Sequence, residues 1–387
     1  MLMALIKCIF KDAFGVPGPV RSIPDHLSGA MEWLCRAQDA AGGGGGVARS
    51  YSLRRHRFFK KKGWMAAYPE TTGYIIPTFF NYADLTRKEE FRQRAVRMAR
   101  WESEVQMPSG AVQGGTVDFP PSPAVFNTGQ VLFGWSRAYR ETGEPGFLES
   151  ARRAADFLCD AQDPDGAWRR AGSRYARPGV NVYDARSAWG LLEAYKVTRD
   201  LRHRESAVRN FDFALSRQQG NGWFAECCLD DDKRPLLHTL AYTMEGLLEG
   251  GLALGEDRLI RAARLAAEAL LARQRPDGSL AGQYDAAWNR AARWRCLTGE
   301  AQTALVWLRF YQITGEKKFL AAGKSLNACL MRTQDLDAAN PGIRGGIKGA
   351  QPIWGKYGEF EFLNWAAKFF AEALLLELTI DRGGILP

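Results

Sequence analysis

The chain repeats itself at a fixed interval of 56 residues. The positions that carry this repeat are Gly110, Gly166, Gly222 and Gly278 and, in a second kind of turn, Thr86, Thr142 and Thr198. A period of this length indicates an array of helical hairpins, because one such unit cannot bury its apolar face without neighbours. The repeat therefore predicts one continuous array rather than several independent domains.

The stretch 125–168 shows what one unit contains. Its first helical segment is apolar almost all round, which is typical of a buried helix. The second segment, 146–162, has apolar residues on one side and charged residues such as Arg152 and Asp156 on the other. A Gln-x-x-Asp-Gly-x-Trp loop closes the unit. We expect a buried inner helix followed by a half-exposed outer helix.

The same pattern can be followed along the chain. Inner helices are predicted near 70–85, 126–141, 183–198, 238–254, 299–314 and 362–380. Outer helices are predicted near 24–40, 88–107, 146–162, 203–219, 256–274 and 316–334. The chain thus opens with an outer helix and ends with an inner one, and these two can pair and close a ring. We predict an all-α fold, an (α/α)6 toroid over 21–387 as a single domain, after an N-terminal extension over 1–20.

Composition excludes some settings. Charged residues interrupt every apolar run before it reaches membrane-spanning length, and Lys7 breaks the apolar start of the chain. We therefore expect neither a membrane span nor a signal peptide. The seven cysteines are an odd number, and two of them, Cys35 and Cys159, lie on predicted outer helices. Core packing explains them better than disulfides, which indicates a reducing, cytoplasmic setting.

The net charge of +9 is concentrated in the connections that lead from an outer helix to the next inner helix. The segment 49–62 alone holds seven Lys and Arg residues. These connections are long, and they surround the starts of all six predicted inner helices, where the helix dipoles are positive. The sequence therefore predicts an electropositive bowl on one face of the ring, suited to an anionic ligand.

Aromatic residues share these connections, and their rings can stack on sugars. Together with the charge they favour an acidic oligo- or polysaccharide as partner. A nucleic acid is not expected, because no nucleic-acid-binding motif is present and the basic residues line a concave surface. Oligomeric state stays open. The predicted substrate-binding residues on this face are Trp64, Trp168, Trp223, Trp288, Arg293, Trp354, Tyr357 and Glu359.

Polar residues at the starts of the predicted inner helices are the candidates for chemistry. They are Tyr68, Glu70, Asn127, Tyr183, Asp184, Arg186 and His238. Helix capping would explain several of them, since Asn and Asp are good N-cap residues. Asp184 stands out because an aromatic residue and an arginine flank it. A carboxyl group in an aromatic, partly desolvated pocket can keep its proton and act as a general acid.

Two kinds of sugar chemistry fit these residues. Hydrolysis would pair Asp184 with Glu70 or Glu359. A lyase or a uronate epimerase instead needs a base, an acid and a group that neutralises the substrate carboxylate. The residues that could supply these are Tyr68, Tyr183, His238 and Tyr357 for the base and acid, and Asn127 and Arg186 for the carboxylate.

Two segments, 125–147 and 181–215, resemble successive inner-helix segments of the unsaturated glucuronyl and rhamnogalacturonyl hydrolases. The resemblance implies a six-hairpin toroid in which an Asp stands near the start of each of two inner helices. In that family one of these protonates the double bond of an unsaturated uronic acid, and hydration follows. Asp184 occupies the second of these positions. The first holds Asn127, which cannot serve as a carboxylate.

The Gln-Asp-Gly loops also resemble the Gln-Trp repeats of triterpene cyclases, where they join outer helices. The acid motif of the cyclases, Asp-x-Asp-Asp, is absent, because Leu229 stands where its first Asp would be. No metal-ligand spacing is present, and the glycine run 42–46 lacks the following Lys-Ser/Thr of a phosphate-binding loop, so we expect no cofactor.

We predict a carbohydrate-active enzyme that cleaves glycosidic bonds in a uronate-containing glycan, by hydrolysis or β-elimination. The alternatives are a uronate or sugar epimerase, a non-catalytic glycan-binding toroid and a terpene-cyclase-like toroid.

Overall fold

The computed structural model describes residues 2–384. Its inner helices are α3 (Pro69–Thr86), α5 (Val125–Thr142), α7 (Ala185–Thr198), α9 (Leu237–Leu254), α11 (Leu297–Thr314) and α13 (Asn364–Asp381). Its outer helices are α2 (Ile23–Ala40), α4 (Glu89–Val105), α6 (Pro145–Ala161), α8 (Leu201–Ser216), α10 (Asp257–Leu271) and α12 (Lys317–Met331). Each predicted helix is present in its predicted class, and the 3-10 turn Val182–Asp184 precedes α7.

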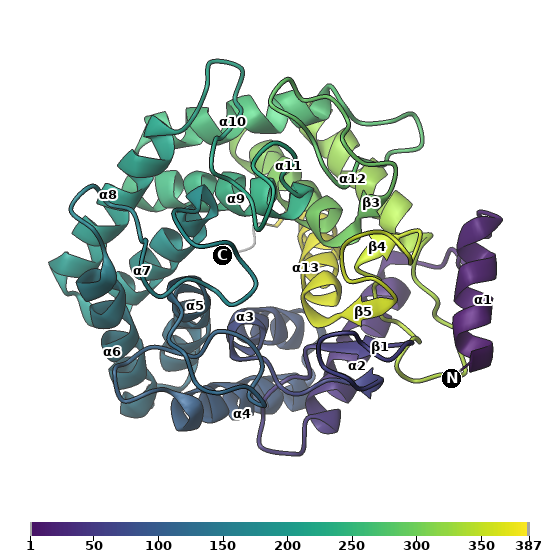
Figure 1. The fold of residues 1–387 in the computed structure, drawn as a ribbon, viewed down its shortest axis with the longest axis horizontal. Helices are drawn as coiled ribbons and strands as arrows, with labels where there is room; N and C mark the ends of the chain where they lie inside the picture. Colours follow the sequence, from purple (N-terminus) through teal and green to yellow (C-terminus); the bar gives the residue numbers. More distant parts are fainter. Residues whose placement is uncertain (1, 385–387) are drawn as a thin grey trace.

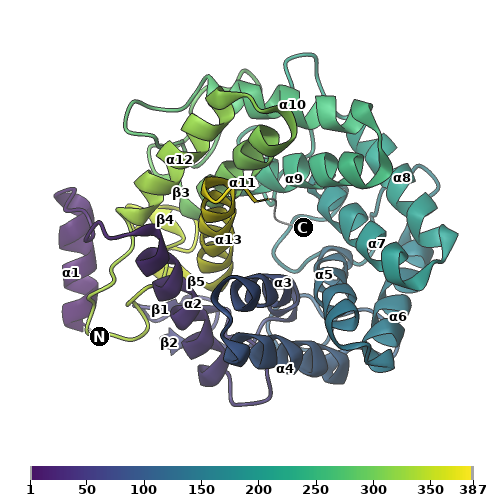
Figure 2. The same cartoon turned by 180° about the vertical axis from the view of Figure 1, so that it is seen from behind.

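The helices form two concentric rings (Figure 1). α13 packs against α2, α3 and α11, so the last inner helix closes the circle with the first outer helix, as the sequence predicts. The helix α1 (Leu2–Ala13) lies outside the ring. Seen from behind, the near ends of the inner and outer helices are joined by short turns (Figure 2). The long connections lie on the opposite face, above the starts of the inner helices.

The long connections carry two small sheets. The first has the order β2-β1-β5, formed by β1 (Ser50–Ser52), β2 (Gly63–Trp64) and β5 (Glu361–Leu363). Tyr51 is paired with Trp64 on one side and with Phe362 on the other. The second sheet pairs β3 (Arg295–Cys296) with β4 (Ala350–Gln351). The first sheet joins loops from opposite ends of the chain across the ring closure, and the second joins the loops that precede α11 and α13.

At the end of every outer helix, within its last turn or just after it, a glutamine joins that helix to the next outer helix. In each case the side-chain amide donates to a backbone carbonyl of its own loop and to one on the neighbouring helix. Gln162, for example, donates to the Gly166 carbonyl at 3.0 Å and to the Ser206 carbonyl at 2.9 Å. The six glutamines are Gln38, Gln106, Gln162, Gln218, Gln274 and Gln334. Gln334 donates to the carbonyl of His26 on α2 and so closes the circle.

The repeated glycine of each loop makes this contact possible. Gly166 has φ of +88°, a conformation that suits glycine, and a Cβ there would lie 2.2 Å from the carbonyl oxygen of Arg209. Gly110 has the same φ and meets the backbone of Arg153 at the same distance. The 56-residue period in the sequence therefore corresponds to the spacing of these close contacts between a loop and the next outer helix.

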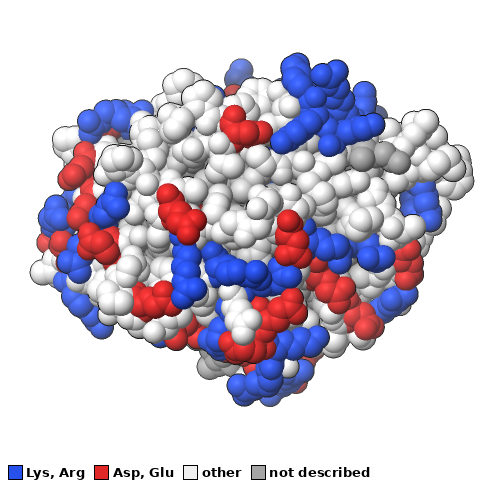
Figure 3. Space-filling model, turned by 90° about the horizontal axis from the view of Figure 1, so that it is seen from below, with Lys and Arg blue, Asp and Glu red and all other residues white. Residues whose placement is uncertain are grey.

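Charge is distributed unevenly around the ring. Seen from the side, Lys and Arg gather in one cluster near one rim, while along the opposite rim they are mixed with Asp and Glu (Figure 3). All seven cysteines are free, as expected. Within residues 2–384, no helix combines the length and apolarity that crossing a bilayer requires.

We expect Gln162→Leu to lower the free energy of unfolding by about 2 kcal/mol or more, because it removes two amide donations and leaves Ser206 and Arg209 without the side-chain oxygen to which they donate. Urea denaturation measures this. The matched control is Gln219→Leu, since Gln219 is exposed; its effect should stay within about 0.5 kcal/mol. Equal effects of the two substitutions would show that the bridge contributes nothing.

One carboxyl group is buried inside the fold away from the lumen. Glu102 on α4 is fully buried, and neither of its carboxyl oxygens has a hydrogen-bond partner among the described residues. Desolvation raises its pKa well above the usual value. The folded state therefore favours the protonated form, and ionisation of Glu102 opposes folding.

We expect Glu102→Gln to gain stability relative to the wild type as pH rises from 5 to 8. A group with a raised folded-state pKa costs nothing below its unfolded pKa and costs progressively more above it. The difference in unfolding free energy between the two proteins should grow by roughly 1–3 kcal/mol over this range. Comparing two pH values cancels the constant cost of burying the amide. A difference that does not change with pH would contradict the burial of an unpaired carboxyl.

Candidate active site

The inner helices place about one side chain per turn on the lumen of the ring. On α3 these are Glu70, Tyr74 and Asn81, from the loop face to the short-turn face. This spacing divides the lumen into three layers. The upper layer lies at the helix starts, a middle layer of aromatic rings follows, and a chamber occupies the lower half.

The upper layer contains a chain of hydrogen bonds from three predicted residues. The Tyr68 hydroxyl donates to Oε2 of Glu70, and Nδ2 of Asn127 donates to the Tyr68 hydroxyl at 3.3 Å. Asn127 is fully buried, and its Oδ1 has no hydrogen-bond partner among the described residues. The two inner-helix starts α3 and α5 thus present a carboxyl, a phenol and an amide side by side.

Glu70 is at the centre of this layer. Burial raises its pKa to about 7, although the Tyr68 hydrogen bond and the charges of Arg186 and Arg49 lower it. A carboxyl with this pKa can both hold and release a proton near neutral pH. Burial raises the pKa of the surrounding phenols, and the charge of Glu70 raises it further. These phenols are Tyr68, Tyr74, Tyr175, Tyr183 and Tyr242.

Asp184 ends the 3-10 turn before α7 and is 6% exposed. No donor among the described residues reaches its carboxylate, and it does not cap α7. Desolvation raises its pKa well above the usual value and so favours the protonated form. Burial raises the pKa of Tyr183 well above its usual value, and the charges of Asp184 and Glu70 raise it further.

His238 at the start of α9 is a neutral base. Its Nδ1 lies 2.6 Å from Oε1 of Gln302, an acceptor, so Nδ1 carries the proton and Nε2 keeps its lone pair. Burial lowers the pKa of His238 to about 3. Its ring lies 4.3 Å from that of Tyr242 and 5.5 Å from that of Tyr357. Trp365 donates to the Tyr357 hydroxyl at 2.9 Å.

Arg49 and Glu361 belong to this layer but were not singled out from the sequence. Nη1 of Arg49 lies 3.0 Å from Oε1 of Glu361, and Nε2 of His56 lies 3.7 Å from Oε2 of the same carboxylate. The Arg49 guanidinium also lies over the rings of Tyr175 and Trp365. Only the pairing of β1 with β5 brings these residues together, and no sequence spacing indicates it.

Three predicted sugar-stacking tryptophans lie outside the lumen. Trp168, Trp223 and Trp288 are 2–3% exposed, because their rings pack inside the loops that join the outer helices. Trp168 donates to the carbonyl of Leu158, and Trp223 packs against Trp288 with ring centroids 5.2 Å apart. The structure therefore corrects this prediction: these rings support the loops and have no free face for a sugar.

The other predicted binding residues are spread over the loop face. Trp64 packs between Trp33 and Tyr51 and is half-buried. Three of the predicted binding residues are exposed: Arg293, Trp354 and Glu359. Tyr357 alone among this group of predicted binding residues contacts the upper layer, through His238 and Trp365.

Arg186 lies deeper than the sequence suggests. It is 2% exposed and belongs to the middle layer, one turn below the mouth. Its Nε lies 3.0 Å from Oε2 of Glu245, and Nη1 donates to Gln130. The guanidinium is surrounded by five aromatic rings, those of Tyr74, Phe133, Trp189, Tyr242 and Phe369. This layer separates the carboxyls above from the chamber below.

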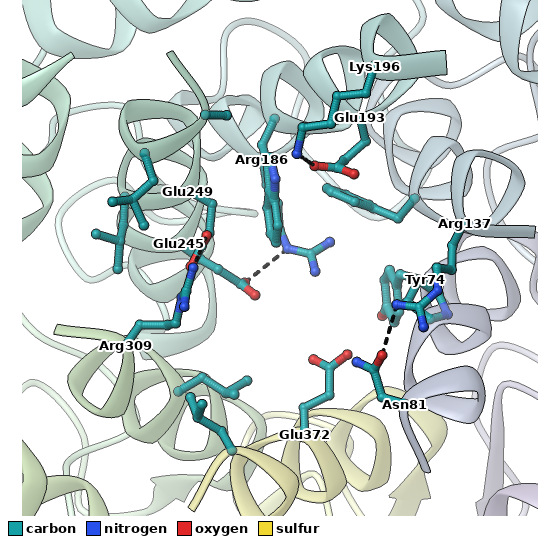
Figure 4. A pocket seen from close by; sticks show the side chains of 18 of the residues that line it. Tyr74, Asn81, Arg137, Arg186, Glu193, Lys196, Glu245, Glu249, Arg309 and Glu372 are labelled. Carbon is teal, nitrogen blue, oxygen red and sulfur yellow. Dashed lines mark hydrogen bonds and ion pairs between the residues drawn. The ribbon is translucent and has the colours of Figure 1, made fainter. Parts of the chain in front are cut away.

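The chamber has a volume of about 930 Å³ and lies between the second halves of the inner helices (Figure 4). The expected bowl on the loop face is instead largely filled, since the predicted catalytic residues there are 2–8% exposed. The reason is that the long loops and their sheets fold over the helix starts, whereas the short turns leave the other end uncovered. Five glutamates, seven basic residues and aromatic and aliphatic side chains line the chamber.

One group of residues has the geometry of metal ligands. Asp156, Asp200 and His203 bring their ligand atoms within 4.8 Å of one another on the outer helices. Arg202 already donates to both carboxylates, at 2.7 and 3.3 Å. An ion-pair network explains this group, and it lies away from the lumen.

No protein-family model and no curated protein sequence matches the chain. Solved structures do. A heparin-specific unsaturated glucuronyl hydrolase is 16% identical, with a TM-score of 0.73 over 93% of this chain and 98% of that one. A second such hydrolase, from a Bacillus species and responsible for glycosaminoglycan degradation, is 17% identical with a TM-score of 0.72, covering 94% and 97%. Cellobiose 2-epimerase from Bacillus thermoamylovorans is 13% identical with a TM-score of 0.69, covering 91% and 97%.

The fold is that of the helical toroids. These comparisons confirm, at the level of fold, the resemblance of segments 125–147 and 181–215 to the glucuronyl hydrolases. At such identities they do not assign an activity, so the chemistry has to be argued from the site.

We expect the Glu70 carboxyl to titrate with a midpoint near 7. Carbon-13 NMR of protein labelled at the glutamate carboxyl carbons measures this. The resonance should be absent from Glu70→Gln. The resonance of exposed Glu359, identified with Glu359→Gln, serves as the internal reference. A Glu70 midpoint below 5 would mean that the upper layer is open to water.

Proposed function

We propose that the protein is a carbohydrate-active enzyme that acts on a uronate-containing glycan at the upper layer of the lumen. The observation that carries this proposal is Asp184, a buried carboxyl with no partner among the described residues, whose pKa desolvation raises. Such a group costs stability, and an acid catalyst is a physical reason for keeping it. The helical-toroid neighbours named for glucuronyl hydrolysis support the same substrate class.

In this proposal Asp184 gives its proton to the glycosidic oxygen or to an unsaturated uronate ring. Glu70 is the second carboxyl, and its pKa near 7 lets it accept a proton from water at neutral pH. The free Oδ1 of Asn127 accepts a hydrogen bond from a substrate hydroxyl, and the Tyr68 hydroxyl fixes Glu70 from the side. Asn127 thus positions the substrate where a carboxylate would transfer a proton.

The basic residue nearest this layer supplies the contact for the substrate carboxylate. Arg49 has one carboxylate partner, Glu361, and its Nε has no hydrogen-bond partner among the described residues. The carboxylate of a uronate bound at the upper layer would accept a hydrogen bond from Nε of Arg49. Elimination is the variant of the proposal in which a phenol of the layer removes the proton next to the carboxylate.

Epimerisation is the second candidate. His238 favours it, because its unprotonated Nε2 is a base that glycoside hydrolysis by two carboxyls does not need. A neighbour with the same fold is named a cellobiose 2-epimerase. Deuterium incorporation from heavy water into an unbroken sugar distinguishes epimerisation from cleavage.

We expect Asp184→Asn to lower kcat at least about 100-fold on a uronate-containing oligosaccharide, the usual contribution of a general acid, with KM changed little. Release of unsaturated or saturated uronate measures the rate, and near-UV circular dichroism checks the fold. The matched control is Asp230→Asn, an exposed loop carboxyl, which should retain full activity. Unchanged turnover in a folded Asp184→Asn protein would remove Asp184 from the mechanism.

A further inference from the structure

The chamber at the short-turn end is a built cavity that the proposed chemistry does not use. The middle layer of Arg186 and aromatic rings lies between it and the upper carboxyls. At about 930 Å³ it has the size of a small-ligand site. Its lining residues come from all six inner helices, and most of the charged ones are held in position by one another (Figure 4).

Most of these charges are balanced in pairs. Arg309 is 2.8 Å from Glu249, Lys368 is 2.5 Å from Glu372, and Arg186 pairs with Glu245. Each pair presents donors and acceptors to the cavity together. A ligand with many hydroxyl groups can satisfy both kinds, whereas an aliphatic ligand would leave them without partners.

One corner of the chamber is not balanced. At the ends of α5 and α7, Arg140 and Lys196 share the single carboxylate of Glu193, at 3.1 and 2.5 Å. Arg199 adds a third, exposed cation. The partial negative charge of the two helix ends offsets part of this excess, but it amounts to about half a charge per helix. The corner therefore stays positive.

An aromatic platform lies about two helical turns above this corner. Trp189 is half-buried and lines the chamber, and the ring of Phe133 packs against it at 4.5 Å. Trp189 and Lys196 are both on α7, and both line the chamber. A sugar ring covering Trp189 would point a carboxylate or sulfate on the same residue or its neighbour toward the three cations.

We propose that the chamber is a second carbohydrate-binding site, which takes an acidic sugar with its ring on Trp189 and its anionic group at Arg140, Lys196 and Arg199. This proposal does not depend on the proposed chemistry, since the ligand class is argued from the chamber lining alone. The chamber opens on the face opposite to the upper layer, so the two sites can be occupied independently.

The test is fluorine NMR of protein labelled with 5-fluorotryptophan. The resonance of Trp189 is identified with Trp189→Phe and reports on the chamber, and that of Trp365, identified with Trp365→Phe, reports on the upper layer. Cellobiouronate should shift the Trp189 resonance at concentrations at which cellobiose does not. The double variant Lys196→Gln with Arg199→Gln should raise the Kd from the Trp189 signal by about tenfold.

The charge-matched control is Arg261→Gln with Lys317→Gln on exposed outer-helix positions, and it should leave that Kd unchanged. Three results would overturn the proposal: a Trp189 resonance that does not move with cellobiouronate, one that moves equally with cellobiose, or one that moves more with octanoate. Because Trp365 is read in the same spectrum, failure of the upper site is seen separately from failure of the chamber.

Discussion

The ring depends on one hydrogen-bonding unit used six times. A glutamine at the end of each outer helix bridges its own loop to the next outer helix, and the last bridge, from Gln334 to His26, joins the last outer helix to the first. Each bridge donates to one carbonyl of its own loop and to one of the neighbouring helix, and so holds the two segments together. Since each glycine beside it has no Cβ, the loop can lie against the neighbouring helix backbone. The bridges fix the outer ring, and the outer ring fixes the lumen.

A rigid lumen explains how buried charges persist in the middle of the molecule. Arg186 is almost fully buried, and it is held by Glu245, by Gln130 and by five aromatic rings. Removing one partner of such a group would leave a buried charge unpaired. The layer around it separates the buried carboxyl Asp184 above from the charged chamber below. The two ends of one lumen can therefore serve different ligands or steps.

Sequence reasoning was strongest where the period carried the information. The twelve helices, the closure of α2 on α13 and the place of Glu70, Asn127, Asp184 and His238 at inner-helix starts all follow from the repeat. It was weakest for the loops. Trp168, Trp223 and Trp288 lie in the predicted connections yet pack inside them, because loop packing depends on contacts between repeats that no period encodes. Arg49 and Glu361 meet only through a sheet between distant loops.

The sequence by itself determined the class of fold and the register of each inner helix, since hydrophobic periodicity and glycine spacing act locally and repeat along the chain. Only the tertiary structure decided which end of the ring is open. That outcome depends on how six long loops fill the space over the helix starts, and on how the basic side chains find carboxylate partners across neighbouring helices. These are contacts between residues far apart in the chain, and their energies are set by burial and geometry, which the order of residues does not display.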